Sequence, residues 1–253
     1  MPRLIVFLLV LSLGLAPPAA AFEGKAKLGP DAVTITERTE YLRAAPAPDY
    51  WKLSAFYVPQ LTSSACSVAS AAMAVNFARG VPAEAETPLV TQPALLESVG
   101  DASWSEKGAE GGDGVTFEEF VSVLEDSLRS YAIEDYAIEV IRPDDASAGS
   151  LAKVREALAA NEVSDRDLIL MYFNQGVLTG DWDGPHISPI GAYDRDARQV
   201  LIMDVDREWY VPYWSPDQKL LEALLKPAPA EHGPLAGETG GLVWIKLSGA
   251  TRD

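Results

Sequence analysis

The sequence predicts an α+β protein with a helical first half and an antiparallel sheet in its second half. The run CSVASAAMAVNFA over residues 66–78 is Ala-rich and apolar, which is typical of a buried helix. Residues 116–130 place Phe, Val and Leu at the spacing of an amphipathic helix. Apolar runs of strand length dominate the second half. Helices followed by strands favour α+β over an alternating βαβ arrangement.

The first residues have the features of a secretory signal peptide. Arg3 precedes an apolar run over residues 4–15, two prolines break that run, and alanines over residues 19–21 form a cleavage pattern. A transmembrane helix needs roughly 20 apolar residues, so the run is too short to span a bilayer; an uncleaved anchor is the alternative. We expect residues 1–21 to be removed and the protein to be exported, periplasmic or secreted, with no stable membrane association after cleavage.

Two further parts follow the signal peptide. Residues 22–50 are polar and rich in Pro and Ala, which predicts an extended N-terminal arm. Residues 51–253 are long enough for one domain with a full core. The first helix of that domain begins at Cys66 and has Gly80 as its C′ residue. Its candidate N-caps are Thr62, Ser63 and Ser64.

The remaining elements follow in chain order. Residues 82–114 predict a loop that contains a short helix over residues 93–99, and Thr116 with Glu119 indicates a capping box at the start of the amphipathic helix. A Pro- and Gly-rich loop covers residues 227–241. Further helices are expected over residues 150–160 and 219–225, and strands over residues 137–141, 168–173 (a continuous apolar run that suits a central strand), 186–193, 200–205 and 242–247.

The charge balance disfavours two classes of partner. The chain has 37 acidic and 20 basic residues, a formal net charge of −17. Such an excess of negative charge repels the phosphates of nucleic acids and the head groups of anionic lipids. We therefore expect neither nucleic acid nor a membrane surface as a partner, and we attribute most of the charge to the surface of an exported protein.

The chain contains a single cysteine, Cys66, so it can form no intramolecular disulfide. A lone thiol in an oxidising compartment is open to oxidation, so its presence in an exported protein favours a functional role. The N-terminus of an apolar helix offers unpaired amides and the positive end of the macrodipole, which favour a thiolate nucleophile. The alternative is a small buried apolar side chain, a common use of free cysteine.

The two histidines of the chain occupy different settings. His232 lies in a Pro- and Gly-rich loop and is interpreted as a solvated side chain. His186 begins one predicted strand and Asp204 lies near the end of the next, so antiparallel pairing brings them close. There the aspartate can orient the imidazole and stabilise its charged form, although it can also be a solvated strand terminus. Cysteine, then histidine, then an orienting polar residue is the order found in papain-like enzymes.

Three segments carry a family resemblance. PQLTSSACSVASAAMAVN, DGPHISPIGAYDRDARQVLIMDVDREWYVPYW and GVTFEEF resemble the catalytic domain of the phytochelatin synthase family. The segments come in the family's order, and the resemblance extends from about Trp51 to Leu247. It implies a papain-like cysteine protease fold in which Cys66, His186 and Asp204 are the catalytic residues.

The resemblance also implies roles for two further residues. Gln60 matches the family's oxyanion-hole glutamine, whose amide would stabilise a tetrahedral oxyanion beside the backbone N–H of the cysteine. Arg207 matches a substrate-binding arginine, which can hold a carboxylate through two hydrogen bonds. The alternatives are a polar loop residue for Gln60 and a pair with a neighbouring acid for Arg207. Gly240 and Gly241 stand where the family is expected to have a basic residue.

By that resemblance, we expect a glutathione γ-glutamylcysteinyltransferase that attacks the Cys–Gly bond of glutathione or a related γ-glutamyl thiol peptide. Because the chain has no Cys-rich segment, hydrolysis is expected to exceed transfer. One cysteine and two separated histidines form no evident metal site. No bound cofactor is expected, and heavy-metal ions such as cadmium would act as metal–thiolates of the substrate. The alternatives are an exported cysteine peptidase for other peptides and a non-enzymatic periplasmic protein that binds thiol peptides or metals.

Overall fold

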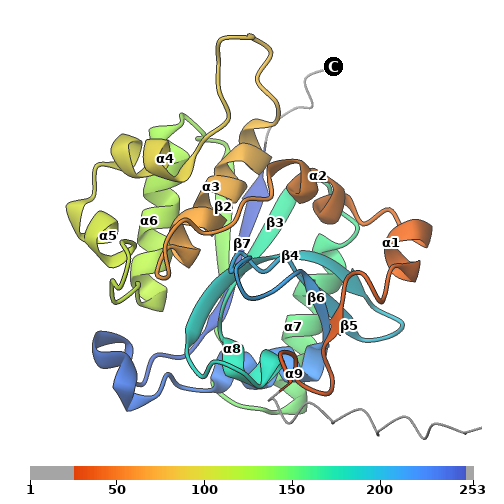
Figure 1. The fold of residues 1–253 in the computed structure, drawn as a ribbon. Coiled ribbons are helices and arrows are strands. Elements are labelled where there is room, and N and C mark those ends of the chain that lie inside the picture. The colour runs from red at the N-terminus through yellow and green to blue at the C-terminus, as the bar shows by residue number, and fades with distance from the viewer. Residues whose placement is uncertain (1–25, 249–253) are drawn as a thin grey trace, which may run out of the picture.

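The computed structural model describes residues 26–248, and the predicted signal peptide at residues 1–21 lies outside them. Within the described residues, seven strands form one sheet in the order β1-β6-β5-β4-β3-β7-β2, and all neighbouring strands are antiparallel (Figure 1). The strands are β1 (Val33–Thr34), β2 (Tyr136–Ile141), β3 (Asp167–Asn174), β4 (Pro185–Asp194), β5 (Gln199–Ile202), β6 (Tyr213–Pro216) and β7 (Gly241–Leu247).

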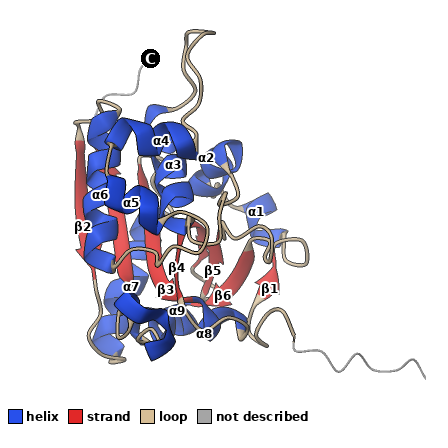
Figure 2. Ribbon diagram, turned by 60° about the vertical axis from the view of Figure 1, so that its left-hand side comes forward, coloured by secondary structure: helices blue, strands red, loops and turns tan. Residues whose placement is uncertain are grey.

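Helices cover both faces of this sheet (Figure 2). They are α1 (Glu40–Ala44), α2 (Pro48–Phe56), α3 (Cys66–Arg79), α4 (Gln92–Val99), α5 (Ala102–Lys107), α6 (Phe117–Ser130), α7 (Ala148–Asn161), α8 (Gln175–Thr179) and α9 (Asp217–Leu225), with a 3-10 helix η1 (Ala230–Leu235). Helices dominate the first half and strands the second, which confirms the α+β prediction. None of the helices within residues 26–248 is long and apolar enough to cross a bilayer.

Strand β3 shows how the sheet separates two cores. Leu168 and Leu170 pack with α3 and α6, whereas Ile169 and Met171 pack with α7 and α9 on the other face. All eight residues of β3 are buried. A strand buried on both faces needs a continuous apolar run rather than an alternating one, so the prediction of a central strand here is confirmed.

The prediction of an extended arm over residues 22–50 is wrong for the residues that the structure describes. β1 pairs with β6, and Val33 lies opposite Trp214. Leu42 and Ala47 are buried in the core beside α3, and α2 already begins at Pro48. Single apolar side chains in a polar segment dock on a distant core, and no local periodicity reveals such docking.

Two boundary predictions on the helices have different outcomes. The capping box is confirmed at α6, where the Thr116 side chain accepts from the Glu119 N–H and the Glu119 side chain from the Thr116 N–H. The predicted N-caps of α3 are wrong, because its N-cap is Ala65, which makes no side-chain capping bond. The three hydroxyls before it are turned to a neighbouring loop instead. The sequence patterns also missed β6, α5, α8 and η1.

Candidate active site

Cys66 is the first residue of α3, as the sequence predicted. The helix behind it is buried on all sides from Ser67 to Phe77 and ends at Arg79. Gly80 follows it with a φ of +68°, which glycine adopts without strain. The first-turn amides of α3 have no partner within the helix. They direct the positive end of the helix, which stabilises negative charge, toward the cysteine.

The loop before Cys66 is fastened to the loop that follows α5. The Thr62 hydroxyl donates to the Gly108 carbonyl at 2.6 Å, and the Ser64 hydroxyl donates to the Gly112 carbonyl at 2.6 Å. These bonds fix the approach of the chain to α3. They are the reason that the hydroxyls are not available to cap the helix.

His186 and Asp204 meet across strands β4 and β5. The strands pair in antiparallel register with Ile190 opposite Ile202, and the Met203 N–H donates to the Pro189 carbonyl at 2.9 Å just beyond β5. His186 Nε2 lies 3.0 Å from Asp204 Oδ1, and both side chains are buried, with 4% and 0% exposed. The register that the sequence left open therefore places the aspartate against the imidazole.

Asp204 is held by three further donors. Gln175 Nε2 donates to Asp204 Oδ2 at 2.8 Å, and the Asp206 N–H donates to Asp204 Oδ1 at 2.9 Å. The Tyr57 hydroxyl donates to the Asp204 backbone carbonyl. Burial alone would raise the pKa of Asp204, but the charge and hydrogen bond of His186, together with the bonds from Asp206 and Gln175, outweigh it and lower that pKa below its ordinary value. The carboxylate is therefore ionised.

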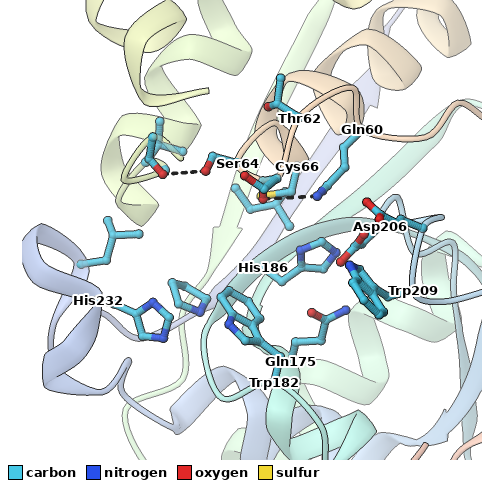
Figure 3. A pocket seen from close by; sticks show the side chains of 18 of the residues that line it. Gln60, Thr62, Ser64, Cys66, Gln175, Trp182, His186, Asp206, Trp209 and His232 are labelled. Carbon is cyan, nitrogen blue, oxygen red and sulfur yellow. Dashed lines mark hydrogen bonds between the residues drawn. The ribbon is translucent and has the colours of Figure 1, made fainter. Parts of the chain in front are cut away.

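The imidazole of His186 stands between Asp204 and Cys66. Burial alone would lower the pKa of His186, but Asp204 outweighs it by charge and hydrogen bonding, and Cys66 adds a hydrogen bond and its own charge; together they raise that pKa to about 10. Figure 3 shows Cys66 and the His186 ring in the same cleft. The charged imidazolium is therefore favoured at neutral pH.

Gln175 is a site residue that the sequence analysis missed. It is the first residue of α8, directly after β3, and it is 1% exposed. A signal was present, because the polar pair Asn174–Gln175 directly follows the continuous apolar run of residues 168–173, where a buried amide needs a partner. The partner, Asp204, lies in another strand connection, so sequence spacing could not identify it.

Gln60 lies at the cleft, and its amide points toward Cys66 in Figure 3. Its backbone N–H donates to the Val205 carbonyl at 2.8 Å, and its Nε2 donates to the Ser63 carbonyl at 3.3 Å. Its Oε1 is buried and accepts no hydrogen bond. A side-chain amide has two N–H donors, so Gln60 Nε2 can make a second hydrogen bond beside the one to Ser63.

Arg207 and His232 make their contacts with residues other than Cys66 and His186. The Arg207 guanidinium lies 4.9 Å from the centroid of the Tyr57 ring, and Arg207 is absent from the residues that line the cleft. Its neighbours Asp206 and Glu208 do line the cleft, and a role for Arg207 in substrate binding stays a prediction. His232 lines the cleft, but its Nε2 contacts the Asp183 carbonyl at 2.7 Å and its ring packs edge-on against Trp182.

The cleft lined by Cys66, His186 and Gln60 has a volume of about 720 Å³. Gly240 shows why no basic side chain stands before β7. A Cβ atom at this position would lie 1.9 Å from the Tyr172 carbonyl oxygen. Within residues 26–248, no group of three or more His, Cys, Asp or Glu side chains is arranged to hold a metal ion.

A cysteine at a helix N-terminus, beside a buried imidazole that an aspartate holds, defines a cysteine-dependent enzyme with a papain-like triad. The comparison with protein families leads to the same class. The family model described as phytochelatin synthase matches residues 33–232. The chain therefore belongs to the phytochelatin synthase family.

Two individual proteins are similar to this chain over different extents. A Lotus japonicus protein named glutathione gamma-glutamylcysteinyltransferase 3 is 43% identical over 61 residues, which are 24% of this chain and 12% of that protein. The match thus spans about an eighth of the curated relative. The crystal structure of the Pseudomonas avirulence protein AvrPphB aligns with a TM-score of 0.32 and 12% identity, over 77% of this chain and 100% of that chain.

Proposed function

We propose that the protein cleaves the Cys–Gly peptide bond of glutathione, or of a related γ-glutamyl thiol peptide, through a γ-Glu-Cys acyl-enzyme on Cys66. The observation that carries the proposal is the buried His186–Asp204 pair beside a cysteine at the N-terminus of α3. Membership of the family supplies the substrate class. The name of the Lotus japonicus relative is consistent with it.

The first half of the reaction forms the acyl-enzyme. The Cys66 thiolate attacks the carbonyl carbon of the Cys–Gly bond, and the electron pair of that carbonyl moves onto its oxygen. The backbone N–H of Cys66 and the free donor of Gln60 are suited to stabilise this oxyanion. The His186 imidazolium then donates its proton to the departing glycine nitrogen as the peptide bond breaks.

The second half releases the γ-Glu-Cys group. Neutral His186 takes a proton from a water molecule, or from the amino group of a second thiol peptide, as that nucleophile attacks the thioester. The Cys66 thiolate departs, and the imidazolium is restored. Water as acceptor gives γ-Glu-Cys, and a thiol peptide as acceptor gives a longer γ-glutamyl chain. We propose hydrolysis as the main outcome, with heavy-metal ions entering only as thiolates of the acceptor.

The test is to incubate the protein with glutathione and to follow glycine and γ-Glu-Cys by mass spectrometry, with and without cadmium. The expected result is release of equal amounts of glycine and γ-Glu-Cys, and its loss in the Cys66→Ser variant. An unrelated peptide serves as the comparison substrate. Cleavage of that peptide with none of glutathione would show a cysteine peptidase of different specificity and would refute the proposal.

A further inference from the structure

The cleft beside Cys66 has an acidic lining. Among the cleft residues that the structure describes, Lys27 is the only lysine or arginine. A negative cleft attracts a positively charged substrate group. The acidic residues that line it are Glu110, Asp113, Asp181, Asp206 and Glu208.

A positive group already occupies one part of this cleft. Lys27 Nζ lies 4.2 Å from the centroid of the Trp209 ring and 5.1 Å from that of the Tyr210 ring. It also lies 3.3 Å from Asp181 Oδ2. An ammonium group over aromatic faces and beside a carboxylate is the arrangement by which proteins recognise amines. We call Asp181, Trp209 and Tyr210 the amine cradle.

The amine cradle is built without help from Lys27. The Tyr210 hydroxyl donates to Asp181 Oδ2 at 3.0 Å, so the carboxylate is held in place. The Trp209 and Tyr210 N–H groups donate to the Asp206 carbonyl at 3.1 and 2.9 Å. Tyr210 is buried, whereas Trp209 is 57% exposed and presents its ring to solvent. A large exposed aromatic side chain at a cleft is typical of a ligand contact.

The amine cradle is also tied to the catalytic residues. The Asp206 backbone joins the two, because its carbonyl holds the aromatic pair and its N–H donates to Asp204 Oδ1 at 2.9 Å. The Asp206 side chain lines the same cleft, where Figure 3 shows it with Trp209 and His186. A ligand bound in the amine cradle is therefore placed at a set distance from the nucleophile.

Lys27 is an occupant that a ligand can displace. Its side chain is 46% exposed, and it belongs to the segment before β1 rather than to the loops that form the amine cradle. An exposed ion pair contributes little to stability. A substrate amine that brings further contacts along the cleft can take its place.

We propose that the amine cradle binds the ammonium group of the substrate, and that Lys27 fills it until the substrate enters. The inference rests on the proposed function in one respect, since the α-amino group of the γ-glutamyl residue is then the ammonium in question. The consequence is a protein that distinguishes thiol peptides by a free N-terminal amine, with its own lysine as a competitor.

The first experiment compares glutathione with N-acetylglutathione, which lacks the ammonium charge, by glycine release. The unmodified protein is expected to prefer glutathione by roughly tenfold in kcat/KM, the scale of an exposed cation–π contact together with its charge pair. In Lys27→Met, KM for glutathione falls several-fold with kcat unchanged, because the competitor is gone. Equal KM values in the two proteins, with no preference for the free amine, would show that Lys27 is only a structural anchor and would overturn the proposal.

Two further variants assign the preference to the amine cradle. Trp209→Leu and Asp181→Asn raise KM for glutathione and leave KM for N-acetylglutathione unchanged, so the preference disappears. The matched control is Lys226→Met. This substitution also removes an exposed lysine–aspartate ion pair, Lys226 with Asp183, but neither residue lines the cleft. It keeps the full preference for the free amine. A loss of preference in this control as well would refute the assignment.

A binding measurement separates this proposal from the proposed function. n-Butylammonium chloride is titrated into Lys27→Met by isothermal titration calorimetry, and the same titration is made with the Lys27→Met/Trp209→Leu double variant. Saturable binding is expected in the first and none in the second. Binding without any turnover of glutathione would reject the proposed function and retain the amine cradle. Turnover of glutathione without binding of the amine would do the reverse.

Discussion

The contact between Gln175 and Asp204 can be tested by the substitution Gln175→Leu, which removes the amide and keeps the side chain's bulk. Gln175 Nε2 donates to the buried carboxylate at 2.8 Å, and Gln175 is 1% exposed. A hydrogen bond to a charged group contributes about 1.5–3 kcal/mol. If that whole contribution supports the imidazolium form of His186, kcat/KM for glycine release falls by about ten- to a hundredfold, at ~1.4 kcal/mol per factor of ten.

The direction of the pH effect distinguishes this role from simple loss of stability. Loss of the donor raises the pKa of Asp204, which is held low partly by this bond. An Asp204 carboxylate that is protonated more readily stabilises the imidazolium less, so the pKa of His186 falls from about 10. The alkaline limb of the pH–rate profile therefore moves to lower pH. A merely structural glutamine would leave that limb in place.

Asn161→Leu is the matched control for this experiment. Asn161 Nδ2 also donates to a buried carboxylate, Asp167 Oδ1, at 3.1 Å, at the other end of β3. Both variants are expected to lose about 1.5–3 kcal/mol of unfolding free energy, measured by urea titration. Only Gln175→Leu is expected to shift the alkaline limb. The reasoning fails if both variants shift it equally, or if neither does.

Three further changes have definite outcomes. Cys66→Ser lowers glycine release from glutathione at least a thousandfold, because a serine at this position lacks the thiolate, and leaves the unfolding midpoint unchanged; retained turnover would exclude Cys66 as the nucleophile. Asp49→Asn removes a carboxyl group whose pKa burial and Asp167 raise to about 9. Since the unfolded carboxyl ionises near pH 4 and the native one does not, native stability falls as pH rises between those values. Thermal unfolding should therefore show the variant more stable at pH 8 and less dependent on pH, and parallel curves for the two proteins would contradict this. Gly240→Arg does not create a substrate contact but destabilises the fold, because its Cβ would lie 1.9 Å from the Tyr172 carbonyl oxygen; an unchanged melting temperature would count against that steric argument.

The helices and strands with strong local patterns could be predicted from the sequence. The apolar run from Cys66 predicts α3, the Thr116 and Glu119 pair predicts the start of α6, and the continuous run in β3 predicts a strand buried on both faces. Each of these features depends on residues a few positions apart, where period, capping and burial are encoded. The short elements β1, α1 and β6 depend on distant partners instead, and the sequence did not reveal them.

By itself, the sequence determined the α+β class, the position of the single cysteine at a helix N-terminus, and the order of cysteine, histidine and aspartate. Only the tertiary structure decided which side chains meet: it set His186 against Asp204, brought Gln175 to the same carboxylate, left Arg207 outside the cleft, and placed Lys27 over Trp209. The physical reason is that hydrogen-bond and charge partners are chosen by strand register and loop packing. Register and packing bring together residues that are far apart in the chain, so the spacing of residues along the sequence does not identify the partners.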